Sequence, residues 1–310
     1  MPFGVPDGPV AYAGEPGAFA EDAVVAAFGD VPRQPVGSFR DVFSAVSNGS
    51  AAAGVVPIEN LLNGTVRETF DLLLEHDLEV VGEVVVPVRL CLAALPGQSL
   101  EDIARVYSHI QALGQAEAFL RTRPWATLTT YNTAGAGRLI RDTAERGAAA
   151  VLSPRAAGVF GLEVLADEIQ GAADNRTRFL VVARPGASRA YSRVRSAGAA
   201  GAPLSGAAGA PLSGAADAHA TAPAVEPRRT TLVFAVRNEP GALLRALRAF
   251  AARGVNLSSL ESRPSRTAAW EYVFWADVDA DAADPACAAA IEKLRAVTTM
   301  VRILGSYRRA

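Results

Sequence analysis

The chain contains very little cysteine, histidine and lysine, and each scarcity removes a class of function. Only two cysteines occur in 310 residues, and Cys91 and Cys287 lie far apart in separate apolar segments. A disulfide framework or a zinc site is therefore not expected. The three histidines are scattered as well, so the sequence predicts no metal site. Lys293 is the single lysine, which means that a bound anion must be held by arginine, hydroxyl groups or backbone amides.

Long apolar runs and a strong charge imbalance are also missing. No window of about 18 residues is apolar and free of charge and proline, so no transmembrane span is expected. The first residues show no basic segment followed by an apolar one, and no secretory signal is expected. The formal net charge is -2 and 50% of the residues are hydrophobic. We therefore expect a sizeable core, no nucleic-acid or membrane partner, and a soluble protein of the reducing cytoplasm.

What the sequence does contain is a repeated order of strands and helices from residue 10 to about residue 185. This order predicts an α/β fold with mostly parallel sheets. The expected strands are residues 10–13, 54–58, 79–95, 105–109, 127–131, 149–152 and 177–183. The expected helices are residues 18–28, 39–46 after Ser38, 65–75 and 112–121, with two more after Asn132 and after Ser153.

Polar residues follow several of these strands directly. They are Glu59 and Asn60, Ser108 and His109, Asn132 and Thr133, and Ser153. Taken singly, each is more commonly a turn or helix-cap residue than a ligand. In open α/β sheets, however, ligands bind beyond the carboxyl ends of strands and near helix N-termini. Their recurrence at strand ends predicts a cleft for a small anion.

The segment DNRTRF at residues 174–179 places one hydroxyl and two guanidinium groups at the start of a buried strand. Thr177 opens this strand, where a side chain can face a cleft and still be held by the sheet. On local propensity alone, Asn175 and Thr177 would cap a turn and the arginines would be solvated. The motifs elsewhere in the chain favour the functional interpretation.

The composition changes sharply after the last of these strands. Residues 187–227 are rich in alanine, glycine, proline and serine, and the octapeptide GAPLSGAA at 201–208 is repeated unchanged at 209–216. Such a segment predicts a flexible linker. Residues 228–310 then show the order βαββαβ of a ferredoxin-like unit. One face of its four-stranded sheet needs cover, and dimerisation would provide it.

Motifs spread over the whole chain resemble those of monofunctional prephenate dehydratases with a C-terminal ACT domain. Any one motif is weak, but all of them in this order are specific. In the first part they are YAGEPGAF (12–19), GVVPIEN (54–60), NGTV (63–66), SHIQALGQ (108–115) and DNRTRFLVV (174–182). In the second part they are NEPGALLRAL (238–247), ESRP (261–264) and WEYVFWAD (270–277).

The resemblance implies a two-lobed catalytic domain over residues 8–186, similar to type 2 periplasmic-binding folds, with the active site between the lobes. The chain would cross between lobes within residues 79–95 and again before Thr177. A linker (187–227) would lead to an ACT regulatory domain (228–310). The implied reaction converts prephenate to phenylpyruvate with loss of water and carbon dioxide, in L-phenylalanine biosynthesis, and needs no cofactor or metal.

Residue roles follow from the same resemblance. Thr177 would be the catalytic hydroxyl, acting mainly as an oriented hydrogen-bond donor to the leaving oxygen. The substrate site would be formed by Asn60, Ser108 and Gln115, with Glu59 in support and Gly17 letting backbone amides approach a carboxylate. Arg178 is either a partner of a substrate carboxylate or an internal strut, and the sequence leaves both open.

The resemblance also implies feedback by L-phenylalanine across an ACT dimer. One wall of the effector site would be Asn238, Gly241, Ala242 and Leu243, and the other would be Glu261, Ser262 and Arg263. The alternative is that Glu261 and Arg263 form only a weak surface ion pair. Whether the chain is a homodimer or a homotetramer, and which amino acids inhibit or activate it, the sequence leaves open.

Three residues depart from the usual family pattern: Ala20 for serine or threonine, Leu61 for serine, and Ile110 for proline. They bear on fine substrate contacts. A related prephenate decarboxylase would lack both the threonine of the TRF motif and the ACT domain. A non-catalytic amino-acid sensor would have no use for the polar residues of the cleft. Arogenate dehydratase activity stays open, because arogenate differs from prephenate only by an amine in place of the keto group.

Overall fold

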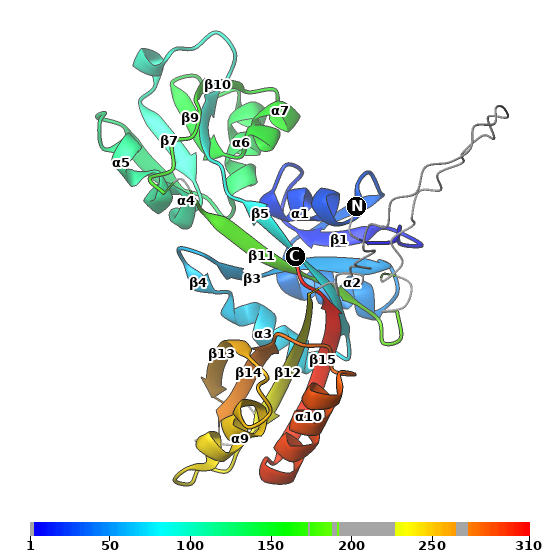
Figure 1. Ribbon diagram of the computed structural model, residues 1–310. Coiled ribbons are helices and arrows are strands. Elements are labelled where there is room, and N and C mark those ends of the chain that lie inside the picture. The colour runs from blue at the N-terminus through cyan, green and yellow to red at the C-terminus, as the bar shows by residue number, and fades with distance from the viewer. Residues whose placement is uncertain (1–2, 173, 188–190, 192–226, 265–271) are drawn as a thin grey trace, which may run out of the picture.

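The chain forms three stacked bodies, each built around its own sheet (Figure 1). The computed structural model describes residues 3–172, 174–187, 191, 227–264 and 272–310. Two α/β lobes form the first part of the chain, and a C-terminal α/β unit packs against the first lobe on the side away from the second lobe. The predicted fold class, two lobes followed by a ferredoxin-like unit, is confirmed.

The first lobe is a mixed six-stranded sheet in the order β2-β1-β3-β11-β5, with β4 paired to β3. Helix α1 packs on one face, and α2 and α3 pack on the other, because apolar side chains alternate along the strands. The strands are β1 (Val10–Ala13), β2 (Arg33–Val36), β3 (Ala53–Asn60), β4 (Gly64–Thr65), β5 (Glu79–Pro87) and β11 (Arg176–Ala183). The helices are α1 (Phe19–Phe28), α2 (Phe39–Ser47) and α3 (Arg67–Glu75).

The second lobe is a five-stranded sheet in the order β10-β6-β9-β7-β8. Its strands are β6 (Cys91–Ala94), β7 (Arg105–Ser108), β8 (Ala126–Thr129), β9 (Ala148–Leu152) and β10 (Glu163–Ala166). Its helical elements are the short 3-10 turn η1 (Leu100–Asp102), α4 (Ile110–Gln115), α5 (Glu117–Leu120), α6 (Thr133–Thr143) and α7 (Pro154–Phe160).

Two connections join the lobes. Strand β5 of the first sheet leads into β6 of the second, and the chain returns from β10 into β11 (Figure 1). The predicted crossovers are therefore confirmed. These strands also correct the expectation of mostly parallel sheets. Each lobe has two parallel strand pairs, and the crossing strands run antiparallel to their neighbours.

Three predicted helix starts are present with the expected capping. Ser38, Asn132 and Ser153 each accept a hydrogen bond from the backbone N–H three residues later, at the N-termini of α2, α6 and α7. Strands β2, β4 and β10 were not predicted. They carry little hydrophobic pattern, because β2 and β4 are half-buried or exposed and β10 lies at the edge of its sheet.

The C-terminal unit has the predicted βαββαβ order, and its sheet is antiparallel throughout in the order β13-β14-β12-β15. Its elements are β12 (Arg228–Ala235), α9 (Ala242–Ala251), β13 (Leu257–Pro264), β14 (Tyr272–Val278), α10 (Pro285–Val297) and β15 (Met300–Arg308). The predicted linker lies outside the described residues, apart from its two ends and Tyr191. Tyr191 is buried beside Phe28 of α1.

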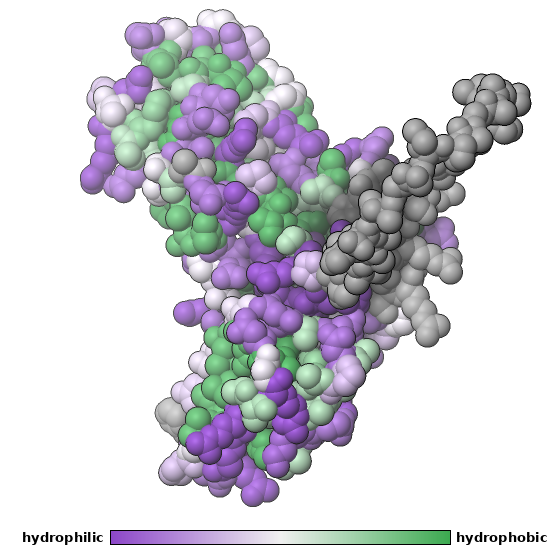
Figure 2. Space-filling view, viewed as in Figure 1, coloured by the Kyte–Doolittle hydropathy of each residue, from purple (hydrophilic) through white to green (hydrophobic). Residues whose placement is uncertain are grey.

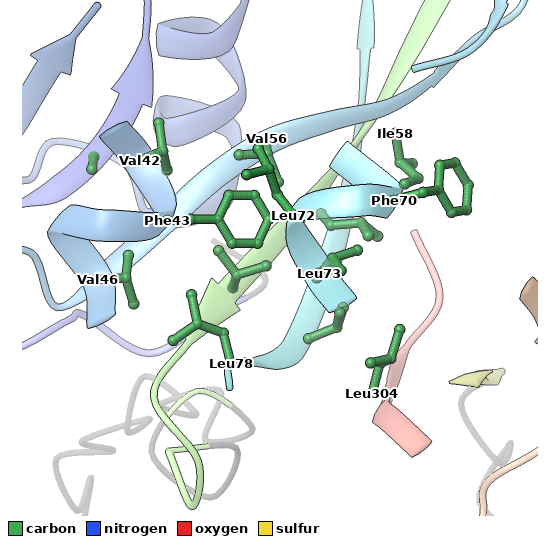
Figure 3. Packing of buried hydrophobic residues seen from close by; sticks show 14 of the residues in the cluster. Val42, Phe43, Val46, Val56, Ile58, Phe70, Leu72, Leu73, Leu78 and Leu304 are labelled. Atoms are coloured by element: carbon green, nitrogen blue, oxygen red, sulfur yellow. The ribbon is translucent and has the colours of Figure 1, made fainter. Parts of the chain in front are cut away.

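Both faces of the C-terminal sheet are packed. Helices α9 and α10 cover one face. The other face contributes Trp275 and Leu304 to the hydrophobic cluster of the first lobe, which also contains Phe70 and Leu73 of α3. Figure 3 shows Leu304 with the α3 residues Phe70 and Leu73. The rings of Phe70 and Trp275 meet edge-on with their centroids 5.0 Å apart. The expectation that dimerisation would cover this face is wrong, because α3 and β5 of the same chain cover it.

Candidate active site

A cleft lies between the two lobes. It consists of two adjoining cavities of about 510 and about 570 Å³, a size suited to a small organic ligand. Residues of both lobes line both cavities: Phe19, Phe39, Pro57, Glu68, His109 and Thr133. The position of the cleft agrees with the one expected from the resemblance.

Several helix N-termini face this cleft. The first cavity is lined by the N-cap residues of five helices, α1, α2, α4, α6 and α7, which are Ala18, Ser38, His109, Asn132 and Ser153. A helix N-terminus carries unpaired N–H groups and a partial positive charge. The cleft is therefore better suited to an anion than to a cation.

Asn60 and Thr177 meet across the paired strands β3 and β11 in the second cavity. Nδ2 of Asn60 donates to Oγ1 of Thr177 at 2.9 Å and to Oδ1 of Asn175 at 3.0 Å, and it lies 3.1 Å from the carbonyl oxygen of Arg176. Oδ1 of Asn60 accepts from the backbone N–H groups two and three residues later, at 3.1 and 2.9 Å. Hydrogen bonds therefore fix both the nitrogen and the oxygen of the Asn60 side-chain amide.

This arrangement determines what the hydroxyl of Thr177 can do. A hydroxyl group has one proton to donate and lone pairs to accept. Because Asn60 donates to Oγ1, the proton of Thr177 is free for a ligand in the cleft. The residue is only 9% exposed, so its surroundings hold it in place. Thr177 is therefore an oriented hydrogen-bond donor on the cleft wall.

The structure brings two further predicted residues to the same cleft. Gln115 lines the second cavity and Gly17 lines the first. Gly17 has φ +87°, and a Cβ added to it would lie 2.5 Å from Cα of Ala156 in the second lobe. Oγ of Ser153 donates to the carbonyl oxygen of Gly17 at 2.7 Å. Glycine is required here because the two lobes touch at this residue.

Ser108 is not brought to the cleft surface. It is completely buried, and its Oγ donates to the carbonyl oxygen of Val151 on the neighbouring strand at 2.6 Å. Its hydroxyl proton is therefore already used. The next residue, His109, lines both cavities instead, and its ring caps α4 by accepting from the N–H of Gln111 at 3.4 Å.

Glu59 and Arg178 lie away from the cleft. Arg178 is next to Thr177 on β11, and its side chain points to the opposite face of the sheet, where Nη2 donates to Asp277 at 2.6 Å. Glu59 is more than half exposed, and its carboxylate lies 4.0 Å from Nε of Arg178. This geometry does not support substrate contact by either residue. It favours the internal strut, which the sequence left as one of two roles for Arg178.

The sequence reasoning missed Arg67 and Glu68, which line the second cavity at the start of α3. Among the described residues, Arg67 is the one arginine on the lining of either cavity. Their position in the sequence could have indicated this role. They follow the NGTV motif directly, at the start of a helix that comes soon after Glu59 and Asn60. Charged residues in the first turn of a helix beside a cleft are candidates for ligand contacts.

The lobes are also joined by a group of polar contacts at the edge of the first cavity. Tyr131 donates to Oε1 of Glu15 at 2.7 Å, and Arg138 donates to Oε2 of Glu15 at 3.0 Å. Burial raises the pKa of the Tyr131 phenol, and its hydrogen bond to Glu15 raises it further. A second ion pair joins Arg155 of α7 to Asp22 of α1. The lobes are therefore joined by side-chain contacts in addition to the two crossing strands.

The seven residues predicted for the effector site lie at one end of the C-terminal sheet. Ala235, which precedes the turn with Asn238 and Gly241, and Arg263 on β13 are both paired with Val273. Gly241, with φ +78°, begins α9, and Ala242 and Leu243 follow in its first turn. In β13, Glu261 and Arg263 are half-buried and Ser262 is exposed. A contact with a second chain at this end stays a prediction.

Glu261 and Arg263 do not pair only with each other. Oε2 of Glu261 accepts from Oγ1 of Thr65 at 3.3 Å, and Arg263 contacts both carboxylate oxygens of Asp71 at 3.2 and 3.3 Å. Thr65 lines the second cavity. The alternative of a simple surface ion pair is therefore wrong, and β13 is connected to the cleft through β4 and α3.

Two features are absent from the described residues. Within them, no group of three or more histidine, cysteine, aspartate or glutamate side chains could hold a metal ion. None of the helices in the same part of the chain is long and apolar enough to span a membrane.

The fold and the cleft together define a two-lobed α/β protein with an interlobe site and a C-terminal ferredoxin-like unit. Comparison with known proteins supports this class: residues 10–187 match the prephenate dehydratase family, and residues 230–296 match the ACT domain. The chain belongs to the prephenate dehydratase family and carries an ACT domain.

The chain is similar to several named relatives and solved structures. The chain is 35% identical to arogenate dehydratase/prephenate dehydratase 2 of Arabidopsis thaliana, over 96% of this chain and 72% of the relative. It is 32% identical to the prephenate dehydratase of Arthrobacter aurescens solved in complex with L-Phe, with a TM-score of 0.78 over 97% of this chain and 90% of the other. A structure described as a quorum-quenching acylase has a TM-score of 0.80 at 29% identity, over 97% and 98% of the two chains.

Proposed function

We propose that the protein converts prephenate to phenylpyruvate with loss of water and carbon dioxide, and that L-phenylalanine regulates it through the ACT domain. The observation that supports the reaction best is the hydroxyl of Thr177, which Asn60 fixes at 2.9 Å with its proton free toward the cleft. We also propose the domain division at residues 8–186, 187–227 and 228–310.

The reaction makes modest demands on the protein. Prephenate carries one carboxylate on the ring, one on the side chain, and a ring hydroxyl. The ring becomes aromatic when the ring carboxylate and the hydroxyl leave. The bond from the ring to the carboxylate breaks, its electron pair enters the ring, and the bond to the hydroxyl oxygen breaks at the far end. Carbon dioxide leaves, and hydroxide leaves and takes a proton from solvent to become water.

Each part of the cleft has a task in this scheme. Thr177 donates to the leaving oxygen, and this bond strengthens as negative charge develops there. Such assistance is worth roughly 10²–10⁴-fold in rate. The helix N-termini of the first cavity hold one carboxylate, and Gln115 contacts the substrate in the second cavity. The backbone N–H of Gly17 already donates to Glu21 at 2.6 Å, so Gly17 contributes the close contact of the lobes and not a hydrogen bond to the substrate. No step in this scheme needs a metal or a redox cofactor.

Arogenate is the alternative substrate, since several relatives carry that name. It would place an ammonium group where prephenate has a keto group. The acylase activity named for one similar structure would need an activated nucleophile. Within the described residues, the hydroxyl of Thr177 has Asn60 as its side-chain partner, and an amide cannot act as the base for such a step. This geometry favours the dehydratase.

For regulation, we propose that L-phenylalanine binds between the turn at Asn238–Leu243 of one subunit and the segment Glu261–Arg263 of another. A solved relative was obtained in complex with L-Phe, which supports this choice of effector. The contacts of Glu261 with Thr65 and of Arg263 with Asp71 provide one connection from that site to the cleft. The proposed assembly is a homodimer or a homotetramer.

One experiment tests the proposal directly. The purified full-length protein is incubated with prephenate and, separately, with arogenate, and phenylpyruvate and phenylalanine are measured with and without added L-phenylalanine. We expect phenylpyruvate from prephenate and a lower rate with L-phenylalanine. Turnover of arogenate alone would replace the proposed substrate, and turnover of neither would overturn the proposed reaction.

A further inference from the structure

Thr177 and Arg178 are neighbours on β11 and project to opposite faces of the sheet, because successive side chains of a strand alternate. Thr177 lines the cleft, whereas the side chain of Arg178 is 15% exposed and faces the ACT domain. Nη2 of Arg178 donates to Oδ2 of Asp277 on the ACT strand β14 at 2.6 Å. Nη1 lies 3.7 Å from Oε2 of Glu83 on β5.

The carboxylates of Asp277 and Glu83, which Arg178 contacts from the first lobe, are also bound by residues of the ACT domain. Oγ1 of Thr231 donates to the other oxygen of Asp277 at 2.6 Å and lies 2.6 Å from the hydroxyl of Tyr307. Nη1 of Arg229 donates to Oε2 of Glu83 at 2.6 Å. All five residues are buried. The network therefore joins three ACT strands to the two strands that cross between the lobes.

A charge at this boundary is unfavourable unless it is paired, because it has lost its water. Burial opposes the charge of Arg178, but the carboxylates of Asp277 and Glu83 outweigh this effect and raise its pKa. Arg229 already holds Glu83 at a shorter distance. Asp277 is therefore the principal partner of Arg178, and the pair ties β11 to the ACT sheet.

The pairing of β11 with β3 is irregular at this point, whereas its pairing with β5 is regular here. The register of β11 against β3 shifts between Arg178 and Phe179, which leaves Ile58 as an extra residue in β3. Such bulges change the direction of neighbouring side chains and are common beside active sites. This bulge lies directly after Arg178, one residue beyond Thr177. The side chain of Arg178 therefore anchors a part of the strand where the ladder of backbone hydrogen bonds is interrupted.

We propose that Arg178 is a positioning residue: through its ion pair with Asp277, the ACT domain holds β11 so that the hydroxyl of Thr177 faces the substrate. This inference rests on the proposed dehydratase function and adds the route by which an ACT ligand reaches the active site. A ligand that shifts the ACT sheet moves Asp277, and with it the strand that carries Thr177. A displacement of about 1 Å at a reacting group can lower the rate by roughly 10²-fold.

The test compares two Asp→Asn substitutions in the full-length protein. Asp277→Asn removes the charge that holds Arg178. Asp77→Asn is the matched control, because Asp77 also forms an ion pair across the domain boundary, with Arg302 of the ACT domain at 3.3 Å, but its side chain is 91% exposed. We expect Asp277→Asn to lower kcat by roughly 10²-fold and to change KM by less than about 3-fold. We expect Asp77→Asn to behave as the wild type.

A second variant separates positioning from stability, because Asp277→Asn alone leaves Arg178 poorly paired. The double variant Arg178→Gln/Asp277→Asn replaces both charges by amides and leaves no unpaired charge. We expect its melting temperature to return toward the wild-type value while kcat stays low. Recovery of kcat together with the melting temperature would show a merely structural role and would overturn the inference.

The response to L-phenylalanine provides an independent readout. In the double variant we expect calorimetric binding of L-phenylalanine as in the wild type, with the change in rate reduced to less than about 2-fold. Unchanged inhibition would contradict the proposed route, and would favour the contacts of β13 with β4 and α3. A wild-type protein without dehydratase activity would overturn the proposed function, and this inference with it. An active wild type with a recovered double variant would overturn only this inference.

Discussion

The side-chain amide of Asn60 donates to the hydroxyl of Thr177 at 2.9 Å, although 117 residues separate them in the chain. The two residues are paired across β3 and β11, close to the point where the chain passes between the lobes. The contact fixes the direction of the threonine proton. The first two predictions follow from it.

Removal of the hydroxyl of Thr177 should abolish the assistance that it gives to the leaving oxygen. We expect Thr177→Val to lower kcat by roughly 10²–10⁴-fold, with a melting temperature close to that of the wild type because valine has a similar shape. Thr177→Ser keeps the hydroxyl and should retain much more activity than Thr177→Val. Steady-state assays and thermal melts provide the comparison, and near-normal turnover of Thr177→Val would rule out the assigned role.

Substitution of Asn60 by aspartate should redirect the hydroxyl proton of Thr177 away from the substrate. A carboxylate cannot donate, so Thr177 would donate its own proton to residue 60 and lose its donor role toward the substrate. We expect the single variants Asn60→Asp and Thr177→Val to lower kcat by similar factors. The double variant should be only slightly less active than either, because residues that act as a unit are strongly non-additive. Independent, additive losses would show that the pair does not act together.

The sequence predicted which residues line the cleft better than it predicted the orientation of each side chain. Asn60, Gln115 and Thr177 were found because motifs of fixed spacing surround them, and each of the three lines the second cavity. The orientation of Ser108 could not be predicted, because a serine at a strand end can face the cleft or the sheet. Here the hydroxyl of Ser108 donates to the carbonyl oxygen of Val151 on the neighbouring strand.

The fold was predictable to a similar degree. Apolar periodicity and caps at Ser38, Asn132 and Ser153 located most of the elements. The direction of the strands was not predictable from local pattern, because β5 and β11 run antiparallel to their neighbours only as a result of joining two lobes. The role of Arg178 depended on Asp277, which lies 99 residues away on another domain.

Gly17 provides a prediction about the contact between the lobes. A Cβ at this position would lie 2.5 Å from Cα of Ala156, and the backbone has φ +87°. Gly97→Ala is the matched control, because Gly97 has φ +73° and no neighbour within 4 Å of an added Cβ. Both variants should lose about 1 kcal/mol or more of stability through the positive φ.

Only Gly17→Ala should also separate the lobes. We expect KM for prephenate to rise by about 10-fold or more, because a wider cleft no longer brings the helix N-termini of both lobes to one ligand. Small-angle scattering should show a larger radius of gyration for Gly17→Ala than for Gly97→Ala. Equal KM values for the two variants would show that the contact of Gly17 with Ala156 has no part in substrate binding.

The two cysteines provide a prediction about pH. Cys91 and Cys287 are both buried and free, and burial raises the pKa of their thiols to about 12 and about 11. Because the thiolate is the reactive form, neither thiol should react with Ellman's reagent in the folded protein between about pH 7 and 9. Both should react as soon as the chain is unfolded by denaturant.

The same shifts determine how stability changes in alkali. Above the ordinary thiol pKa, near 9, the unfolded chain loses thiol protons that the folded chain keeps. The unfolded state then binds fewer protons, so the free energy of unfolding falls as pH rises through this range. Replacing both cysteines by alanine should remove part of this decline, which denaturant titrations at pH 8 and pH 10 would measure. A decline of the same size in the double variant would assign it to other groups, such as the buried Tyr12 and Tyr307, whose pKa values burial also raises.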